Sequence, residues 1–63
     1  MPSRIVFAAG GSDLTVKEDV VAVFDALNEA HGVPTRLTAE DGSVVYVNPT
    51  TITYWKPEER AGG

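Results

Sequence analysis

The stretch Asp19–His31, with the sequence DVVAVFDALNEAH, decides the fold because no other part of the chain has clear helical periodicity. Its apolar residues recur at spacings of three and four, which places them on one side of a helix with about 3.6 residues per turn. They are Val20, Val23, Phe24, Leu27 and Ala30. The segments before and after it are typical of short strands. This side of the helix is therefore expected to pack on a sheet and close a small core.

The residues before this stretch are compatible with two helix starts. Thr15 and Glu18 have the spacing of a capping box, which would start the helix at Val16. Asp19 would instead cap a helix that begins at Val20. We favour the second start, because the first hairpin needs the residues up to Val16 for its return strand.

Five further segments are rich in β-branched and aromatic residues, as strands are. They are Arg4–Ala9, Leu14–Val16, Thr35–Ala39, Ser43–Val47 and Thr51–Lys56. Gly32 suits the left-handed position after the helix, and Pro34 stops its continuation. The order ββαβββ predicts an α+β fold in which one helix packs across a single, mainly antiparallel five-stranded sheet. Residues 1–56 are expected to form one domain and residues 57–63 a flexible C-terminal tail.

The loop Glu40–Gly42 determines the register of the second hairpin. A two-residue loop at Asp41 and Gly42 would mix polar and apolar side chains on both faces of the hairpin. A three-residue loop with Gly42 at a bulge leaves one face apolar, and we favour it for that reason. It pairs Leu37 with Val45, Thr35 with Val47 and Arg36 with Tyr46.

Alternation along the strands divides the apolar residues into a core and an outer face. The expected core is Ile5, Phe7, Leu14, Val16, Val20, Val23, Phe24, Leu27, Leu37, Val45, Val47, Ile52 and Tyr54. One helix covers only one side of a sheet, so the other side is expected to carry Arg4, Val6, Arg36, Thr38, Val44, Tyr46, Thr53 and Trp55. An exposed patch of this kind marks an interaction site, and Tyr, Trp and Arg dominate interface hot spots.

These residues predict a small non-enzymatic protein-interaction module. Its partner-binding residues would be Arg4, Val6, Arg36, Val44, Tyr46, Thr53 and Trp55. The module would self-associate as a homodimer or dock a protein partner. Two alternatives remain. A strongly curled sheet would enclose Tyr46 and Trp55 as part of a barrel-like core, or the same two rings would stack on single-stranded nucleic acid with Arg4 and Arg36 on the phosphates.

Nine acidic and five basic residues give the 63-residue chain a net charge of −4. Nonspecific binding of duplex DNA and docking on anionic membranes are disfavoured, since both need a basic surface. The chain has no cysteine for a disulfide, and one histidine is too few for a zinc-finger ligand set. No apolar run approaches the roughly 20 residues of a membrane span, and no signal-peptide core is found. A cytoplasmic protein without metal or cofactor is therefore expected.

No enzyme motif surrounds the polar residues. A nucleophile–base arrangement would need His31 beside a serine, but Ser3, Ser12 and Ser43 lie in expected terminal or turn segments. His31 has a simpler interpretation as a favourable charge at the C-terminal end of the helix. The chain is therefore expected not to be an enzyme, and no small-molecule substrate is predicted.

The C-terminal Gly62-Gly63 follows a hairpin, a helix and further strands, and in this the chain resembles the β-grasp sulfur carriers and ubiquitin-like modifiers. In that family the terminal glycine carboxylate is adenylated and then carries sulfur or forms an amide. The resemblance implies an alternative function as a carrier that acts through Gly62 and Gly63. The chain departs from the family pattern in that Pro57–Ala61 separates the last strand from the two glycines.

The segment Leu37–Tyr54, LTAEDGSVVYVNPTTITY, follows a helix that contains ALN. Its DG…VYVNP…I.Y pattern is similar to that of small actinobacterial and actinophage proteins of unknown function. The similarity spans residues 14–56 and consists of structural features, namely a bulged hairpin, an Asn-Pro break and an edge strand. It implies no activity, because that group has no assigned chemistry.

Overall fold

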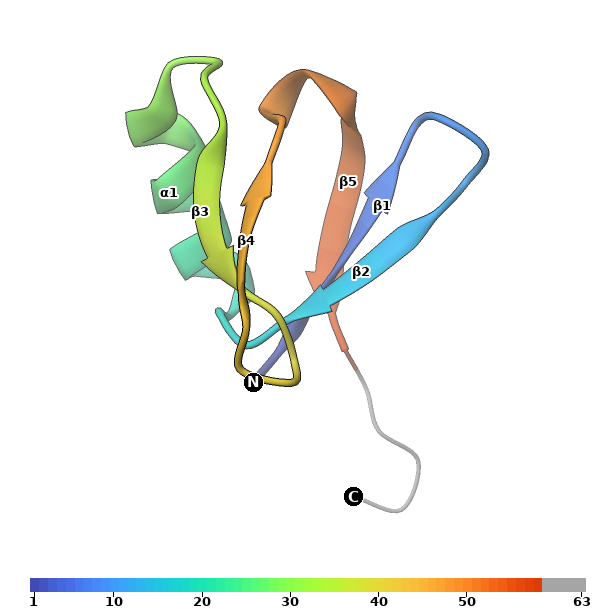
Figure 1. Cartoon of the computed structure of the whole chain (residues 1–63), viewed down its shortest axis with the longest axis vertical. Coiled ribbons are helices and arrows are strands. Elements are labelled where there is room, and N and C mark those ends of the chain that lie inside the picture. The colour runs from blue at the N-terminus through green and yellow to red at the C-terminus, as the bar shows by residue number, and fades with distance from the viewer. Residues whose placement is uncertain (59–63) are drawn as a thin grey trace.

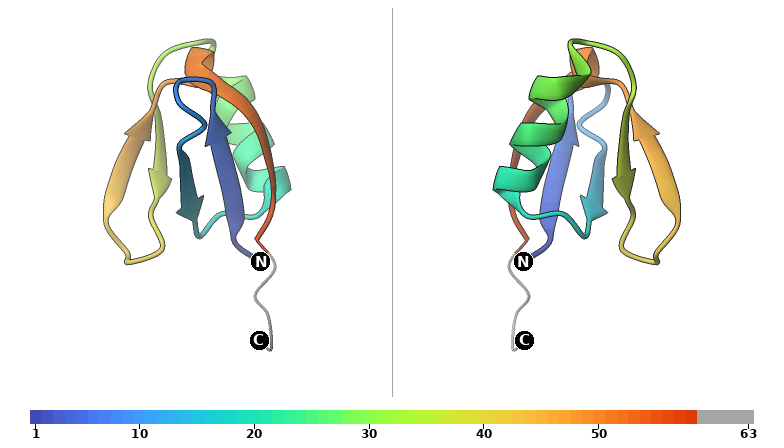
Figure 2. Two further views of the ribbon diagram at one scale, coloured as in Figure 1. Left: turned by 90° about the vertical axis from the view of Figure 1, so that its right-hand side faces the viewer. Right: turned by 90° about the vertical axis from the view of Figure 1, so that its left-hand side faces the viewer.

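The computed structural model describes residues 1–58 and confirms an α+β fold with antiparallel strands (Figure 1). The elements in chain order are β1 (Ser3–Phe7), β2 (Asp13–Val16), α1 (Val20–Ala30), β3 (Thr35–Thr38), β4 (Val44–Val47), a 3-10 turn (Pro49–Thr51) and β5 (Ile52–Pro57). The strands lie in the order β4, β3, β2, β1 and β5, with α1 on one side of them (Figure 2). β4 and β5 are therefore the two outer strands of the described chain.

The prediction of a single five-stranded sheet is wrong. β2, β1 and β5 form one antiparallel sheet, while β3 and β4 form a second, and within residues 1–58 the only strand pairing between the two is an isolated bridge between Val16 and Ala39. Two features produce the interruption: β2 ends at Val16, where the chain turns toward the helix, and the Glu18 side chain bonds the next group on the edge of β3. Beyond the bridge, the backbone N–H of Thr38 donates at 3.0 Å to the Glu18 carboxylate instead of to a strand. A side chain therefore covers the edge of β3 where a longer β2 would have paired.

The helix begins at the expected residue, but fewer of its side chains are buried in the core than expected. Asp19 is the N-cap, and its Oδ1 accepts a 2.8 Å hydrogen bond from the N–H of Ala22. Val23 is fully buried, but Phe24 is 57% exposed, so its assignment to the core is wrong. Successive residues are rotated by about 100° around the helix axis. Phe24 follows the buried Val23 directly, so its side chain points about 100° away from the core direction and lies outside the core.

A β-bulge in β5 reverses the expected orientation of two aromatic residues. Val6 pairs with Tyr54 and Phe7 with Ile52, so Thr53 is an extra residue without a partner in β1. The bulge interrupts the alternation of the strand, and both Ile52 and Trp55 pack against the core. Tyr54 is 49% exposed, so its core assignment is wrong, as is the placement of Trp55 on the outer face.

Trp55 joins the helix to the three-stranded sheet. Its indole Nε1 donates a 3.0 Å hydrogen bond to the carbonyl oxygen of Val20 in the first turn of α1. The central residues of the core are Ile5, Val16, Val23, Leu37 and Val47. Ser3 is also fully buried, and its hydroxyl donates at 2.7 Å to the carbonyl oxygen of Glu18. These two hydrogen bonds hold the start of the helix against the central strand β1 and the outer strand β5 of the three-stranded sheet.

The predicted register of the second hairpin is confirmed. Thr35 pairs with Val47, Arg36 with Tyr46 and Leu37 with Val45. The loop contains three residues, and Gly42 has a left-handed φ of 93°, as a bulge at this position requires. The N–H of Gly42 donates to the carbonyl of Ala39, whose own N–H donates to the carbonyl of Ser43.

Candidate functional site

The outer surface of the β3–β4 hairpin carries four neighbouring side chains that we call the hairpin face: Arg36, Thr38, Val44 and Tyr46. Arg36 lies opposite Tyr46, and Thr38 lies opposite Val44. Tyr46 is 69% exposed and Val44 47% exposed. The face therefore presents a large aromatic ring beside a guanidinium group, with an aliphatic side chain next to them.

The inward residues of the hairpin explain why these four side chains point outward. Leu37 and Val47 are buried in the core, and Thr35 is buried beside them. Because side chains alternate across a strand, burying these residues turns the residues between them to the opposite surface. The Gly42 bulge sets this alternation for both strands together.

The backbone of β4 is open along its outer edge. The hydrogen bond from Ala39 to Ser43 identifies the residues that face β3, and the alternation of an antiparallel pair adds Val45 and Val47 to that set. The N–H and C=O groups of Val44 and Tyr46 consequently face away from β3. No strand of the described chain pairs on that side of β4. The strand VVYV also contains no charge, proline or bulge.

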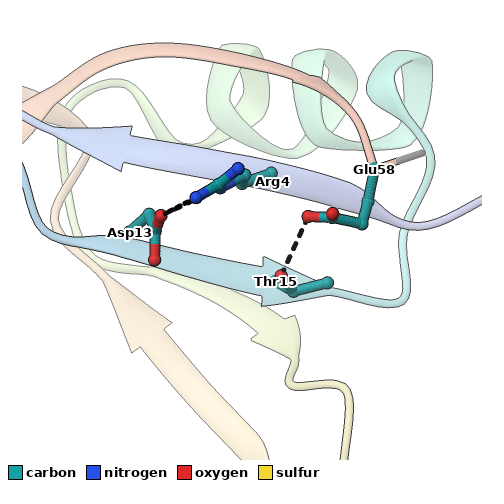
Figure 3. Close-up of polar contacts among 4 residues, drawn as sticks. All are labelled: Arg4, Asp13, Thr15 and Glu58. Carbon is teal, nitrogen blue, oxygen red and sulfur yellow. Dashed lines mark hydrogen bonds and ion pairs between the residues drawn. The ribbon is translucent and has the colours of Figure 1, made fainter. Parts of the chain in front are cut away.

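Arg4 and Val6 lie on the outer surface of the other, three-stranded sheet. Arg4 Nε donates at 2.9 Å to Asp13 Oδ2, and the same residues form an ion pair (Figure 3). The hydrogen bond to Asp13, together with its negative charge, raises the pKa of Arg4. On the same surface, Thr15 donates at 3.3 Å to the Glu58 carboxylate (Figure 3). The polar side chains Arg4, Asp13 and Thr15 on this surface therefore have partners within the chain.

The structure therefore divides the predicted partner-binding residues. It brings Arg36, Val44 and Tyr46 together on the hairpin face. Arg4 and Val6 belong to the separate sheet, and Thr53 is the bulge residue of β5. Trp55 packs against the core and bonds to the helix. The two rings expected to stack on nucleic acid, Tyr46 and Trp55, do not share a surface.

Sequence reasoning missed a second exposed apolar pair, on the helix. Val21 and Phe24 are three positions apart in the sequence, so they are neighbours on the helix surface, and both are exposed. A helical projection centred on Val23 would have indicated this, because it places Phe24 at the margin of the buried side. The pair lies on a helix and not at the edge of a strand, so it offers apolar side chains without a row of backbone groups for strand addition.

Two depressions of about 300 Å³ and about 380 Å³ lie on the described surface. The first is lined by Arg4, Lys56, Pro57 and Glu58, and the second by Asp13, Leu14, Thr15, Ala39, Glu40 and Asp41. Neither lining includes His31 or a serine. His31 is the exposed C-cap of α1, whereas Ser3 is buried at the helix entry.

Residues 1–58 contain no group of three or more His, Cys, Asp or Glu side chains placed to hold a metal ion. Within the same residues, no helix has the length and apolar character needed to cross a membrane. Gly62 and Gly63, the predicted carrier terminus, lie outside the described residues. Comparison with protein-family models, curated proteins and solved structures finds no match to this chain.

Proposed function

We propose that this chain is a small non-enzymatic protein-interaction module that binds through the hairpin face and the open edge of β4. The observation that carries the proposal is the combination of a charge-free edge of β4, with which no strand of the described chain pairs, and an exposed Tyr46 beside it. The binding mode would be strand addition, in which backbone hydrogen bonds supply affinity and neighbouring side chains supply specificity.

The side chains of the hairpin face suit this role. Tyrosine and arginine are enriched at the energetic centres of interfaces, and here Arg36 and Tyr46 lie directly opposite each other. Val44 adds apolar area next to them. The chain as a whole is acidic, but β4 itself carries no charge that would repel a partner strand.

A protein partner is favoured over single-stranded nucleic acid by the position of the second ring. A stacking platform would need successive aromatic side chains in a positively charged groove. Trp55 lies against the core, and the loop next to β4 is acidic, with Glu40 and Asp41. The hairpin face offers one ring and one cation, which is a better fit to a protein surface.

Site-specific photocross-linking tests the proposal with a matched control. A benzophenone amino acid would replace either Tyr46 on the hairpin face or Tyr54 on the three-stranded sheet, since both rings are exposed. In the native cells, the probe at position 46 should form an adduct of defined mass with a protein identified by mass spectrometry. The probe at position 54 should not form this adduct. Adducts from position 54 alone, or from neither position, would overturn the proposal.

A further inference from the structure

Resting on the function proposed above, we propose that the partner at the β4 edge is a second copy of this chain, paired antiparallel about a two-fold axis at Val45. In this register, Val44 of each copy lies opposite Tyr46 of the other. The result is one continuous four-stranded sheet with β3 strands on the outside and two β4 strands in the middle.

In this arrangement the free backbone groups of β4 in one copy lie opposite the free backbone groups of β4 in the other. The N–H and C=O groups of Val44 and Tyr46 face the open edge, and both residues belong to the same alternating set. A two-fold axis at Val45 therefore aligns the free groups of one copy with those of the other, as hydrogen-bonded pairs on either side of the axis. Val44 and Tyr46 also meet as aliphatic–aromatic cross-strand pairs on the hairpin face.

The charges around β4 favour the antiparallel arrangement. A two-fold interface uses the same patch on both copies, so the patch must be complementary to itself. β4 is neutral and meets this condition. The acidic loop with Asp41 precedes β4, so antiparallel pairing places the two loops at opposite ends of the joined strands. Parallel pairing would place them side by side, where like charges repel.

The second sheet has room to grow at β4. β3 and β4 form a sheet of two strands, and its strand pairing with the rest of the described chain is the bridge at Val16 and Ala39, while Leu37 and Val47 pack in the core. An isolated two-stranded hairpin is marginal in water, and both packing and further strands stabilise it; the core supplies the packing here, and the open edge can accept further strands. Pairing two β4 strands converts both hairpins into one larger sheet without any change within either copy.

Single-cysteine variants test the register directly, because the chain has no cysteine of its own. Val45→Cys places two thiols at a non-hydrogen-bonded pair whose Cα atoms are about 4.5 Å apart, within the range of a disulfide. Under one mild oxidant, this variant should form the linked dimer at least about tenfold faster than Val44→Cys, Tyr46→Cys or the helix control Phe24→Cys. Faster linkage at position 44 or 46 than at position 45 overturns the axis at Val45.

Sedimentation equilibrium on cysteine-free protein provides the second measurement. The unmodified chain should dimerise, and Tyr46→Glu should raise the dissociation constant by about 30-fold or more, as expected for an interface hot spot. Tyr54→Glu should dimerise like the unmodified chain, with both variants folded by circular dichroism. A monomer at every concentration, with linkage at position 45 no faster than at position 24, overturns the second copy. The proposed function would then survive only if the probe at position 46 captures a different protein.

Discussion

The two outer strands of the described chain, β5 and β4, differ in how well their free edges are protected against pairing with another strand. β5 has the Thr53 bulge, the lysine Lys56 and a final proline, Pro57, and Trp55 connects it to the helix. Bulges, charges, prolines and covering elements are the usual means by which proteins prevent unwanted strand pairing. β4 has none of these devices within Val44–Val47. This difference is the reason why we place the proposed association at the β4 end of the strand array.

The largest expected effect is a difference in stability between variants of Trp55 and Tyr46, the two aromatic residues that were predicted from the sequence to share one surface. Trp55→Glu would put a charge against the core and remove a large packed ring, and such losses cost about 3–5 kcal/mol. A core of this size supplies only about 3–5 kcal/mol of net stability, so the variant should be unfolded. Far-UV circular dichroism during urea titration measures this. Tyr46→Glu is the control and should remain folded, and equal unfolding of both variants would contradict the contrast between the edges.

A second prediction concerns the edge of β3, which a side chain covers. Glu18→Ala would remove the acceptor of the Thr38 N–H. Leaving this group without its partner should lower the free energy of unfolding by about 1–3 kcal/mol. Hydrogen exchange at the Thr38 amide should also become faster. Glu18→Gln keeps an acceptor oxygen and should lose less stability, and if both variants match the unmodified chain, the carboxylate does not protect this edge.

A third prediction compares the β4 edge with the exposed apolar pair on the helix. Phe24→Glu replaces a ring that is mostly outside the core, so the free energy of unfolding should change by no more than about 0.5 kcal/mol. Association should be unaffected, because the helix backbone has no free edge. Urea unfolding and sedimentation on the same samples measure both quantities. Loss of association in Phe24→Glu, with Tyr46→Glu unaffected, would move the interaction surface from the hairpin to the helix.

The smallest expected effect lies in the loop that precedes β4. The Asp41 carboxylate accepts hydrogen bonds from the side chain and the backbone N–H of Ser43. These bonds, the side-chain one more strongly, lower the pKa of Asp41 below its ordinary value of 3.8. A carboxylate with a lowered pKa in the folded state stabilises the fold above its unfolded pKa and loses this contribution as the pH falls through the folded pKa.

Ser43→Ala tests this loop. The variant should therefore be slightly less stable than the unmodified chain at neutral pH, and the difference should shrink at pH values below 3.8. Urea unfolding across this range measures the difference. A gap that is constant with pH would mean that the hydroxyl acts without the charge of Asp41.

Local signals in the sequence determined the elements whose geometry depends on near neighbours. Asp19 caps the helix because its side chain reaches an N–H three residues away. Gly42 sets the register of the second hairpin because a left-handed residue is needed at that point of the loop. From this register, the exposure of Arg36, Val44 and Tyr46 follows by alternation alone.

The tertiary structure decided what depends on residues far apart in the chain. The Thr53 bulge arises from pairing between β5 and β1, and it moves Trp55 inward and Tyr54 outward. The break between the sheets depends on Glu18 taking the place of a strand beside Thr38. Alternation assumes an unbroken strand, and no local pattern records where long-range pairing interrupts it. The sequence alone therefore determined the hairpin face, whereas only the assembled fold separated it from Arg4, Val6 and Trp55 and left β4 as the unprotected edge.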